Sequence, residues 1–324
     1  MRASLRALLT GVIEYAGMFP PVSLPLDESI RNYLRYCTDS DSWMLGRFIC
    51  PVARLAEVEP FLTEVNPGTL LPIAALGTAG KTRQEWLDNL RRDQRAIRAF
   101  RHQHPGRVTV DVLEMKLPGD FPTDAPGVAE ALAAGVLAEP DSAADPTFFF
   151  EPSFALPSKE MAALIVALAP HRHRVGLKLR CGGAEPAAYP TPADVASIIE
   201  QCHRGRLPLK FTAGLHHPIR HFNKAANVTM HGFINVFCAA LFTWSYDLSR
   251  ESAKRGIIET IVADEDPTHF VFADDSIRWQ DHHLTAKPDV LAATVGMFRR
   301  QVVSFGSCSF DEPRDDLRKL GWLN

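Results

Sequence analysis

Two lysines lie inside apolar runs of this sequence. Lys178 falls within VGLKLRCGG (175–183), and Lys210 falls within LPLKFTAGLHHP (207–218). A lysine forms a Schiff base with a carbonyl group only as the free amine, and burial or a second cation nearby favours the amine by lowering the pKa. Because one strand–helix unit separates the two runs, we expect the lysines on adjacent strands. Paired lysines of this kind predict carbonyl chemistry.

Other charged residues follow or interrupt further apolar runs. They comprise the acids Glu14, Glu114, Glu151 and Asp274 and the cations Arg47, Lys116 and Arg180. We expect Glu114 or Glu151 to transfer protons, and the three cations to bind a carboxylate or phosphate. So many cations near one site would repel each other unless these acids or an anionic substrate balance them. If the strands have the opposite register, the same charges form ion pairs that face the helices.

Histidines suggest a second chemistry. The chain has 12, several of them clustered, and imidazole is the commonest metal ligand. A zinc or manganese site could draw on His216, His231, Glu114, Glu151 and Asp274, although no H-x-H or H-E-x-x-H spacing occurs. Without a metal, we expect His216 to act as an acid–base group and His217 and His231 to contact substrate. Asn235, a polar residue in the apolar run 231–237, is either a substrate contact or a buried structural hydrogen-bonding group.

Short apolar runs alternate with amphipathic segments along the chain. The runs lie near 12–19, 43–50, 70–76, 107–115, 147–152, 174–180 and 207–213. Most are apolar on both faces, which is typical of a buried parallel sheet. Between them, helical spacing of apolar residues predicts helices around 30–37, 161–168 and 195–202. Thr82 with Glu85, and Thr191 with Pro192, are typical of helix starts.

Seven strand–helix units predict a (β/α)8 barrel, with a doubly wound open α/β sheet as the alternative. We expect the eighth strand at 268–273, so that Asp274 ends it, in preference to the long apolar run that begins at 231. The predicted organisation is one domain over 1–324, with a helical insertion at about 219–264 and a C-terminal helix and tail at about 286–324. The tail contains SFGSCSFDEP (304–313), whose Cys308 can act as a nucleophile only if a base pairs with it.

Composition excludes several classes of protein. The 324 residues carry 35 Lys and Arg against 38 Asp and Glu, a net charge of −3, which argues against broad nucleic-acid binding. No apolar run reaches the roughly 18 residues of a membrane span, so no membrane association is expected. The six cysteines form no C-x-x-C pair, which favours a reduced, cytoplasmic protein. The apolar insertion suggests a homodimer surface.

The stretch 176–214 resembles the sixth and seventh strands of class I aldolases of the deoxyribose-phosphate aldolase type. The matching residues are Lys178 with Arg180-Cys181-Gly182-Gly183, Thr191-Pro192, and Lys210 with Ala213-Gly214. The resemblance implies that Lys178 is the Schiff-base lysine and that Lys210 lowers its pKa. Leu215 stands where the family has a second glycine that helps to bind phosphate, and His216-His217-Pro218 follow it.

These observations predict a barrel enzyme of the lyase or aldolase type. It would act on a small anionic carbonyl metabolite through lysine Schiff-base or acid–base chemistry, without a cofactor. The first alternative is a hydrolase or lyase that depends on a divalent metal. The second is a non-catalytic scaffold whose charges form ion pairs toward the helices and whose insertion binds a partner.

Overall fold

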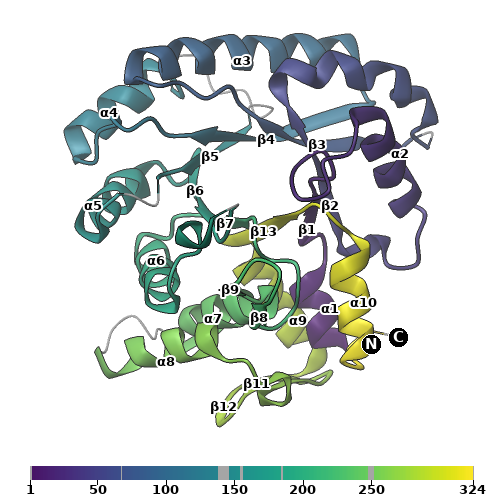
Figure 1. Cartoon of the computed structure of the whole chain (residues 1–324), viewed down its shortest axis with the longest axis vertical. Coiled ribbons are helices and arrows are strands. Elements are labelled where there is room, and N and C mark those ends of the chain that lie inside the picture. Colours follow the sequence, from purple (N-terminus) through teal and green to yellow (C-terminus); the bar gives the residue numbers. More distant parts are fainter. Residues whose placement is uncertain are drawn as a thin grey trace.

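The fold is a closed barrel of eight parallel strands surrounded by helices (Figure 1). The computed structural model describes residues 2–66, 68–137, 146–153, 156–183, 185–246 and 252–323, with the side chains of 252–255 left out. Around the barrel the strand order is β1-β13-β7-β6-β5-β4-β3-β2. The barrel strands are β1 (Ile13–Tyr15), β2 (Leu45–Pro51), β3 (Leu71–Leu76), β4 (Val108–Lys116), β5 (Thr147–Glu151), β6 (Val175–Arg180), β7 (Leu209–Thr212) and β13 (Val302–Ser307). The predicted (β/α)8 barrel is therefore confirmed.

The eighth barrel strand differs from the prediction. It is β13, which pairs with β7 on one side and with β1 on the other. The segment 268–273 contains β10 (Phe270–Phe272) instead, which belongs to a small antiparallel sheet with β11 (Ser276–Trp279) and β12 (His282–Thr285). The prediction failed because 302–307 carries Ser304, Gly306 and Ser307 and so lacks the apolar signature of the other strands.

Helices cover the outside of the barrel. They are α1 (Ala3–Leu9), α2 (Leu26–Tyr36), α3 (Arg83–Gln103), α4 (Ala125–Ala134), α5 (Ser158–Leu168), α6 (Pro192–Gly205), α7 (Phe233–Tyr246), α8 (Ser252–Ala263), α9 (Pro288–Arg299) and α10 (Asp311–Lys319). Between β2 and β3 the chain forms a 3-10 helix over Val52–Glu64 in place of an α-helix. Pro60 lies inside that segment, where it cannot donate the backbone hydrogen bond that an α-helix needs.

The predicted helix starts are present. The Thr82 hydroxyl accepts a hydrogen bond from the backbone N–H of Glu85 at the start of α3. At the start of α6, Thr191 accepts from the N–H of Asp194, and the Asp194 carboxylate accepts from the N–H of Thr191. These caps fix where each helix leaves its preceding loop, and so hold the loops at the C-terminal ends of the strands.

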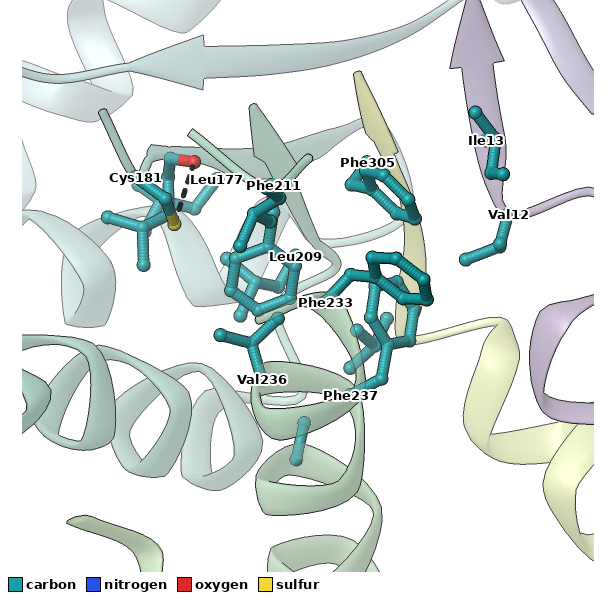
Figure 2. Close-up of a cluster of buried hydrophobic side chains, with 14 of the residues drawn as sticks. Val12, Ile13, Leu177, Cys181, Leu209, Phe211, Phe233, Val236, Phe237 and Phe305 are labelled. Atoms are coloured by element: carbon teal, nitrogen blue, oxygen red, sulfur yellow. Dashed lines mark hydrogen bonds between the residues drawn. The ribbon is translucent and has the colours of Figure 1, made fainter. Parts of the chain in front are cut away.

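Aromatic side chains pack α7 against the outer face of the barrel (Figure 2). Phe233 stacks on Phe305 of β13, with ring centroids 5.0 Å apart, and Phe237 lies 5.7 Å from Phe211 of β7. All four rings are fully buried. This packing explains why the run that begins at 231 is a helix: nearly every side chain along it is enclosed by neighbouring elements.

The segment between β7 and β13 is more varied than the predicted helical insertion at 219–264. It begins with a hairpin of β8 (His221–Asn223) and β9 (Val228–Met230), continues through α7 and α8, and then forms the small sheet and α9. Residues 247–251 of the predicted insertion lie outside the described residues. The predicted C-terminal tail at 286–324 is wrong in part, because β13 within it closes the barrel.

None of the described helices has the length and apolar character that crossing a bilayer requires.

Candidate functional site

A chain of eight charged side chains runs through the barrel interior. In order of contact its members are Asp111, Arg47, Glu14, Lys210, Glu114, Lys178, Glu151 and Arg180, which we call the interior ion-pair chain. The signs alternate along it, so four acids balance four cations.

Strand order shows that these contacts lie inside the barrel. Lys210 stands on β7, whose neighbours are β13 and β6, yet its Nζ contacts Glu14 on β1 and Glu114 on β4. Side chains from non-adjacent strands can meet only through the interior of a closed barrel. The scaffold hypothesis required these ion pairs to face the helices. They point into the barrel instead.

The two lysines are direct neighbours on adjacent strands, as the sequence predicted. Lys178 pairs with Lys210 in the register of β6 and β7. Glu114 bridges them, because Oε1 contacts Lys210 Nζ and Oε2 lies 2.5 Å from Lys178 Nζ. Lys178 Nζ also lies 2.9 Å from Glu151 Oε2. Lys210 Nζ lies 5.6 Å from the centre of the Phe149 ring, which adds a cation–π contact.

Burial and charge act in opposite directions on this group. Burial disfavours the charged form of Glu114, but Lys178 and Lys210 outweigh that effect and lower its pKa to about 2. Burial likewise disfavours the ammonium of Lys178, yet Glu114 and Glu151 raise the pKa of that lysine. The sequence predicted that Lys210 would lower the pKa of Lys178. The pKa is raised instead, because three carboxylates lie between and around the two ammonium groups. The sequence could not show this arrangement.

One end of the interior ion-pair chain reaches the C-terminal mouth of the barrel, where the strands end. Lys178 and Glu151 lie in the last residues of β6 and β5, and Arg180 ends β6 with its side chain 43% exposed. Arg180 Nη1 lies 3.7 Å from Glu151 Oε1. Lys116, exposed at the end of β4, is paired in register with Glu151 and has no carboxylate partner among the described residues. The mouth therefore carries two exposed cations beside the buried Lys178.

The other end lies away from the mouth. Arg47 is the third residue of β2 rather than its last, and it binds Asp111 through two hydrogen bonds of 2.7 and 2.6 Å. Arg47 also lies 3.2 Å from Glu14. We therefore assign Arg47 to holding Glu14 in place, and its predicted role in binding substrate finds no support in this position.

Asp111 was missed from the sequence. A register shift in β4 pairs Ile73 with Val110 but Ala74 with Val112, so Asp111 is an extra residue that forms a bulge. The signal was available, because Asp111 interrupts an apolar strand in the same way as Glu114. The bulge, which sequence periodicity does not reveal, places Asp111 within reach of Arg47, with its side chain 48% exposed.

Glycines hold together the loops that follow β6 and β7. A Cβ on Gly182 would lie 2.8 Å from the Cα of Gly214, and one on Gly214 would lie 2.7 Å from the carbonyl oxygen of Cys181. Gly214 also has a φ of +70°. These two glycines, which carry part of the resemblance to the aldolases, serve close backbone packing here.

A second cluster lies at the C-terminal ends of β7 and β13. His216 Nδ1 lies 3.2 Å from Glu312 Oε2 and 3.8 Å from Cys308 Sγ. Burial disfavours the imidazolium, but Cys308 and Glu312 outweigh it and raise the pKa of His216 to about 9. His217 binds Asp316 of α10 through Nδ1. Glu312 and Asp316 were not predicted as site residues, because the histidines that they contact lie about 100 positions away in the chain.

Three predicted site residues lie in structural positions. Asn235 is buried, with its amide nitrogen donating to the carbonyls of Ile261 and Asp264 and its oxygen accepting from the N–H of Arg220. This is the structural role that the sequence left open, and it leaves the amide nitrogen no free hydrogen for a substrate. Asp274 follows β10 rather than a barrel strand, and its carboxylate accepts from the N–H of Ala3. Its predicted place at the mouth is therefore wrong.

His231 is also buried. Its Nε2 lies 2.7 Å from the carbonyl oxygen of Pro190, just before α6, and its Nδ1 has no hydrogen-bond partner within the described ranges. Burial lowers the pKa of His231. We assign its ring to holding the loop before α6 against the start of α7.

The metal hypothesis drew its ligands from among His216, His231, Glu114, Glu151 and Asp274. In the part of the chain that the structure describes, no three His, Cys, Asp or Glu side chains are arranged to hold a metal ion. Glu114 and Glu151 are bound to lysines, and Asp274 contacts the first helix.

No known protein-family model matches this chain, and no curated protein is similar to it in sequence.

Proposed function

We propose that this protein is an enzyme that acts on a small anionic carbonyl compound at the C-terminal mouth of the barrel. Lys178 carries the reaction by forming a Schiff base, which makes the enzyme a lyase of the aldolase type. The observation behind the proposal is the position of the Lys178 ammonium, held between Glu114 and Glu151 at the end of a barrel strand. Barrel interiors are usually filled by branched apolar side chains, and a buried ion-pair chain contributes little stability for its desolvation cost.

The two carboxylates suit an iminium as well as an ammonium. Lys178 first transfers a proton to Glu151, and the amine nitrogen then attacks the carbonyl carbon. The attack forms a C–N bond and gives a carbinolamine. The C–O bond then breaks, and the oxygen leaves as water with two protons, one returned by Glu151 and one lost by the nitrogen. Ammonium and iminium both carry one positive charge, so the ion pairs with Glu114 and Glu151 that exist before the reaction are present again once the iminium has formed. The raised pKa of Lys178 stabilises the resting ammonium, so the free amine forms only when Glu151 takes the proton, and the iminium then restores the positive charge between the two carboxylates.

Positive charge at the mouth favours an anionic substrate. Arg180 is exposed beside Glu151, and Lys116 is exposed without a carboxylate partner among the described residues. Either cation can bind a carboxylate of the substrate near Lys178. The resemblance of 176–214 to class I aldolases is a separate support for the role of Lys178.

Reductive trapping tests this proposal. The full chain is incubated at pH 7 with cyanoborohydride and either pyruvate or glyoxylate, with acetone and acetaldehyde as neutral counterparts. Hydride reduces the iminium to a stable secondary amine, and peptide mapping locates the added mass. We expect one adduct at Lys178, formed faster with the acids than with the neutral compounds.

Two variants serve as controls. Lys178→Met should lose the adduct, whereas Lys224→Met, which removes an exposed lysine of the β8–β9 hairpin, should keep it. Arg180→Gln should reduce the preference for acids over neutral compounds. Equal labelling of the wild type and Lys178→Met would refute the Schiff-base role.

A further inference from the structure

The proposed function does not use the cluster formed by Cys308, His216 and Glu312. Cys308 directly follows β13, and His216 lies in the loop after β7, the neighbouring barrel strand. Glu312 lies in the first turn of α10. The three residues thus come from two loops and a helix that meet at the C-terminal side of the barrel, where Lys178 also lies.

The contacts arrange a thiol beside a charge-balanced imidazole. His216 Nδ1 lies between Cys308 Sγ at 3.8 Å and Glu312 Oε2 at 3.2 Å. Its other ring nitrogen, Nε2, has no hydrogen-bond partner among the described residues. An imidazolium next to a cysteine stabilises the thiolate, which is the nucleophilic form. The raised pKa of His216, with Cys308 and Glu312 outweighing burial, keeps the ring charged at neutral pH.

Several other titratable groups lie around the His216 imidazole. Glu312 also faces His217, with its Oε1 3.7 Å from Nε2 of that ring, and Asp316 binds the same ring from α10. On the other side, burial raises the pKa of Tyr15 on β1, and the charge of Asp311 raises it further. The environment of His216 is therefore acidic on the α10 side, which favours the imidazolium further.

We infer that Cys308 is a second nucleophile of this protein, paired with His216 as a thiolate that attacks an electrophilic carbonyl carbon. The S–C bond forms as the carbonyl π electrons move to oxygen, and His216 donates a proton to that oxygen to give a neutral thiohemiacetal. The choice of a carbonyl ligand rests on the proposed function. The activation of the thiol by His216 does not, and it can be tested without any substrate.

The remaining cysteines provide an internal standard. Cys37 is exposed and burial raises its pKa, so it should react as an ordinary or slow thiol. Cys50, Cys181, Cys202 and Cys238 are buried, as is Cys308, which is 6% exposed, and burial raises the pKa of each of these four. A single protein sample therefore compares the proposed thiolate with thiols that lack an imidazolium partner.

Alkylation kinetics test the inference. The native full-length protein is treated with iodoacetamide from pH 6 to 9, and each cysteine-containing peptide is quantified by mass spectrometry. At pH 6.5 we expect Cys308 to react roughly tenfold or more faster than Cys37, with a rate that changes little up to pH 8. Over the same range the rate at Cys37 should rise by about tenfold per pH unit, since its thiolate fraction does.

Variants separate activation from folding. In His216→Gln the rate at Cys308 should fall by about tenfold at pH 6.5 and become strongly pH-dependent. His283→Gln, which removes an exposed histidine of β12, should leave the rate unchanged. Unaltered labelling of Cys37 and an unaltered circular dichroism spectrum show that each variant is folded.

Three results would overturn the inference: no labelling of Cys308 under conditions that label Cys37, a steep pH dependence in the wild type, or equal rates in the wild type and His216→Gln. Failure of this inference is distinguishable from failure of the proposed function, because the alkylation assay does not involve Lys178. Conversely, loss of the Lys178 adduct with rapid alkylation of Cys308 would leave only the carbonyl ligand in question.

Discussion

Replacing Glu114 by Gln should destabilise the fold strongly, because Glu114 bridges two buried ammonium groups. The substitution keeps the shape of the side chain, so no cavity forms and the effect is electrostatic. Among the carboxylates of the described residues, Lys210 would keep Glu14 as its partner, and Lys178 would keep Glu151. The substitution thus leaves four cations facing three carboxylates in a chain whose centre is buried.

Two lines of reasoning bear on the magnitude. Removing one partner of a buried ion pair typically costs about 3–5 kcal/mol. The direction of the pKa shift agrees with a large loss, since Lys178 and Lys210 outweigh burial and lower the pKa of Glu114. We therefore expect Glu114→Gln to reduce the free energy of unfolding by about 3 kcal/mol at pH 7.

Urea denaturation followed by tryptophan fluorescence and circular dichroism measures this loss. Glu57→Gln is the matched control, since Glu57 pairs with Arg54 on the surface with side chains 51% and 39% exposed. Exposed pairs contribute about 0–1 kcal/mol, so this control should change the free energy of unfolding little.

A double-mutant cycle with Lys210→Met sharpens the test. Each single substitution leaves its partner's charge buried without that ion pair, whereas the double variant removes both charges. The double variant should therefore lose less free energy of unfolding than the sum of the two single losses. A loss below about 1 kcal/mol for Glu114→Gln, or strict additivity with Lys210→Met, would refute the interior ion-pair chain as a coupled, desolvated unit.

Further outcomes follow from other parts of the structure. Glu114 has a lowered pKa, so its contribution to stability is complete above pH 4.5 and is lost as the pH falls toward 2; acid titration of the unfolding free energy should show this loss in the wild type but not in Glu114→Gln. His216 has a raised pKa, so its contribution is complete below pH 6.5 and is lost as the pH rises through 9; the alkaline loss should shrink in His216→Gln. Phe237→Ala should cost about 3–5 kcal/mol in urea denaturation, whereas Phe222→Ala, at an exposed ring, should stay within about 0.5 kcal/mol. Thr191→Ala removes the cap of α6 and should cost about 1 kcal/mol, measured in the same way; no loss would mean that the cap is not formed in solution.

The sequence by itself determined the barrel and much of its charged interior. Continuous apolar runs and amphipathic spacing depend on local periodicity, which a buried parallel strand and a covering helix both impose on their own residues. For the same reason, Lys178 and Lys210 stood out as charges inside apolar runs. Their register as neighbours followed from having one strand–helix unit between them.

Tertiary structure alone decided which segment closed the barrel and which charges met. β13 is recognisable only through its partners β7 and β1, because its small polar residues carry no periodic signal. Residues far apart in the chain meet in three places: at the bulge of Asp111, where Glu114 bridges the two lysines, and where α10 returns beside His216. The pKa of a buried group depends on the sum of these distant charges, so its direction could not be obtained from neighbours in the sequence.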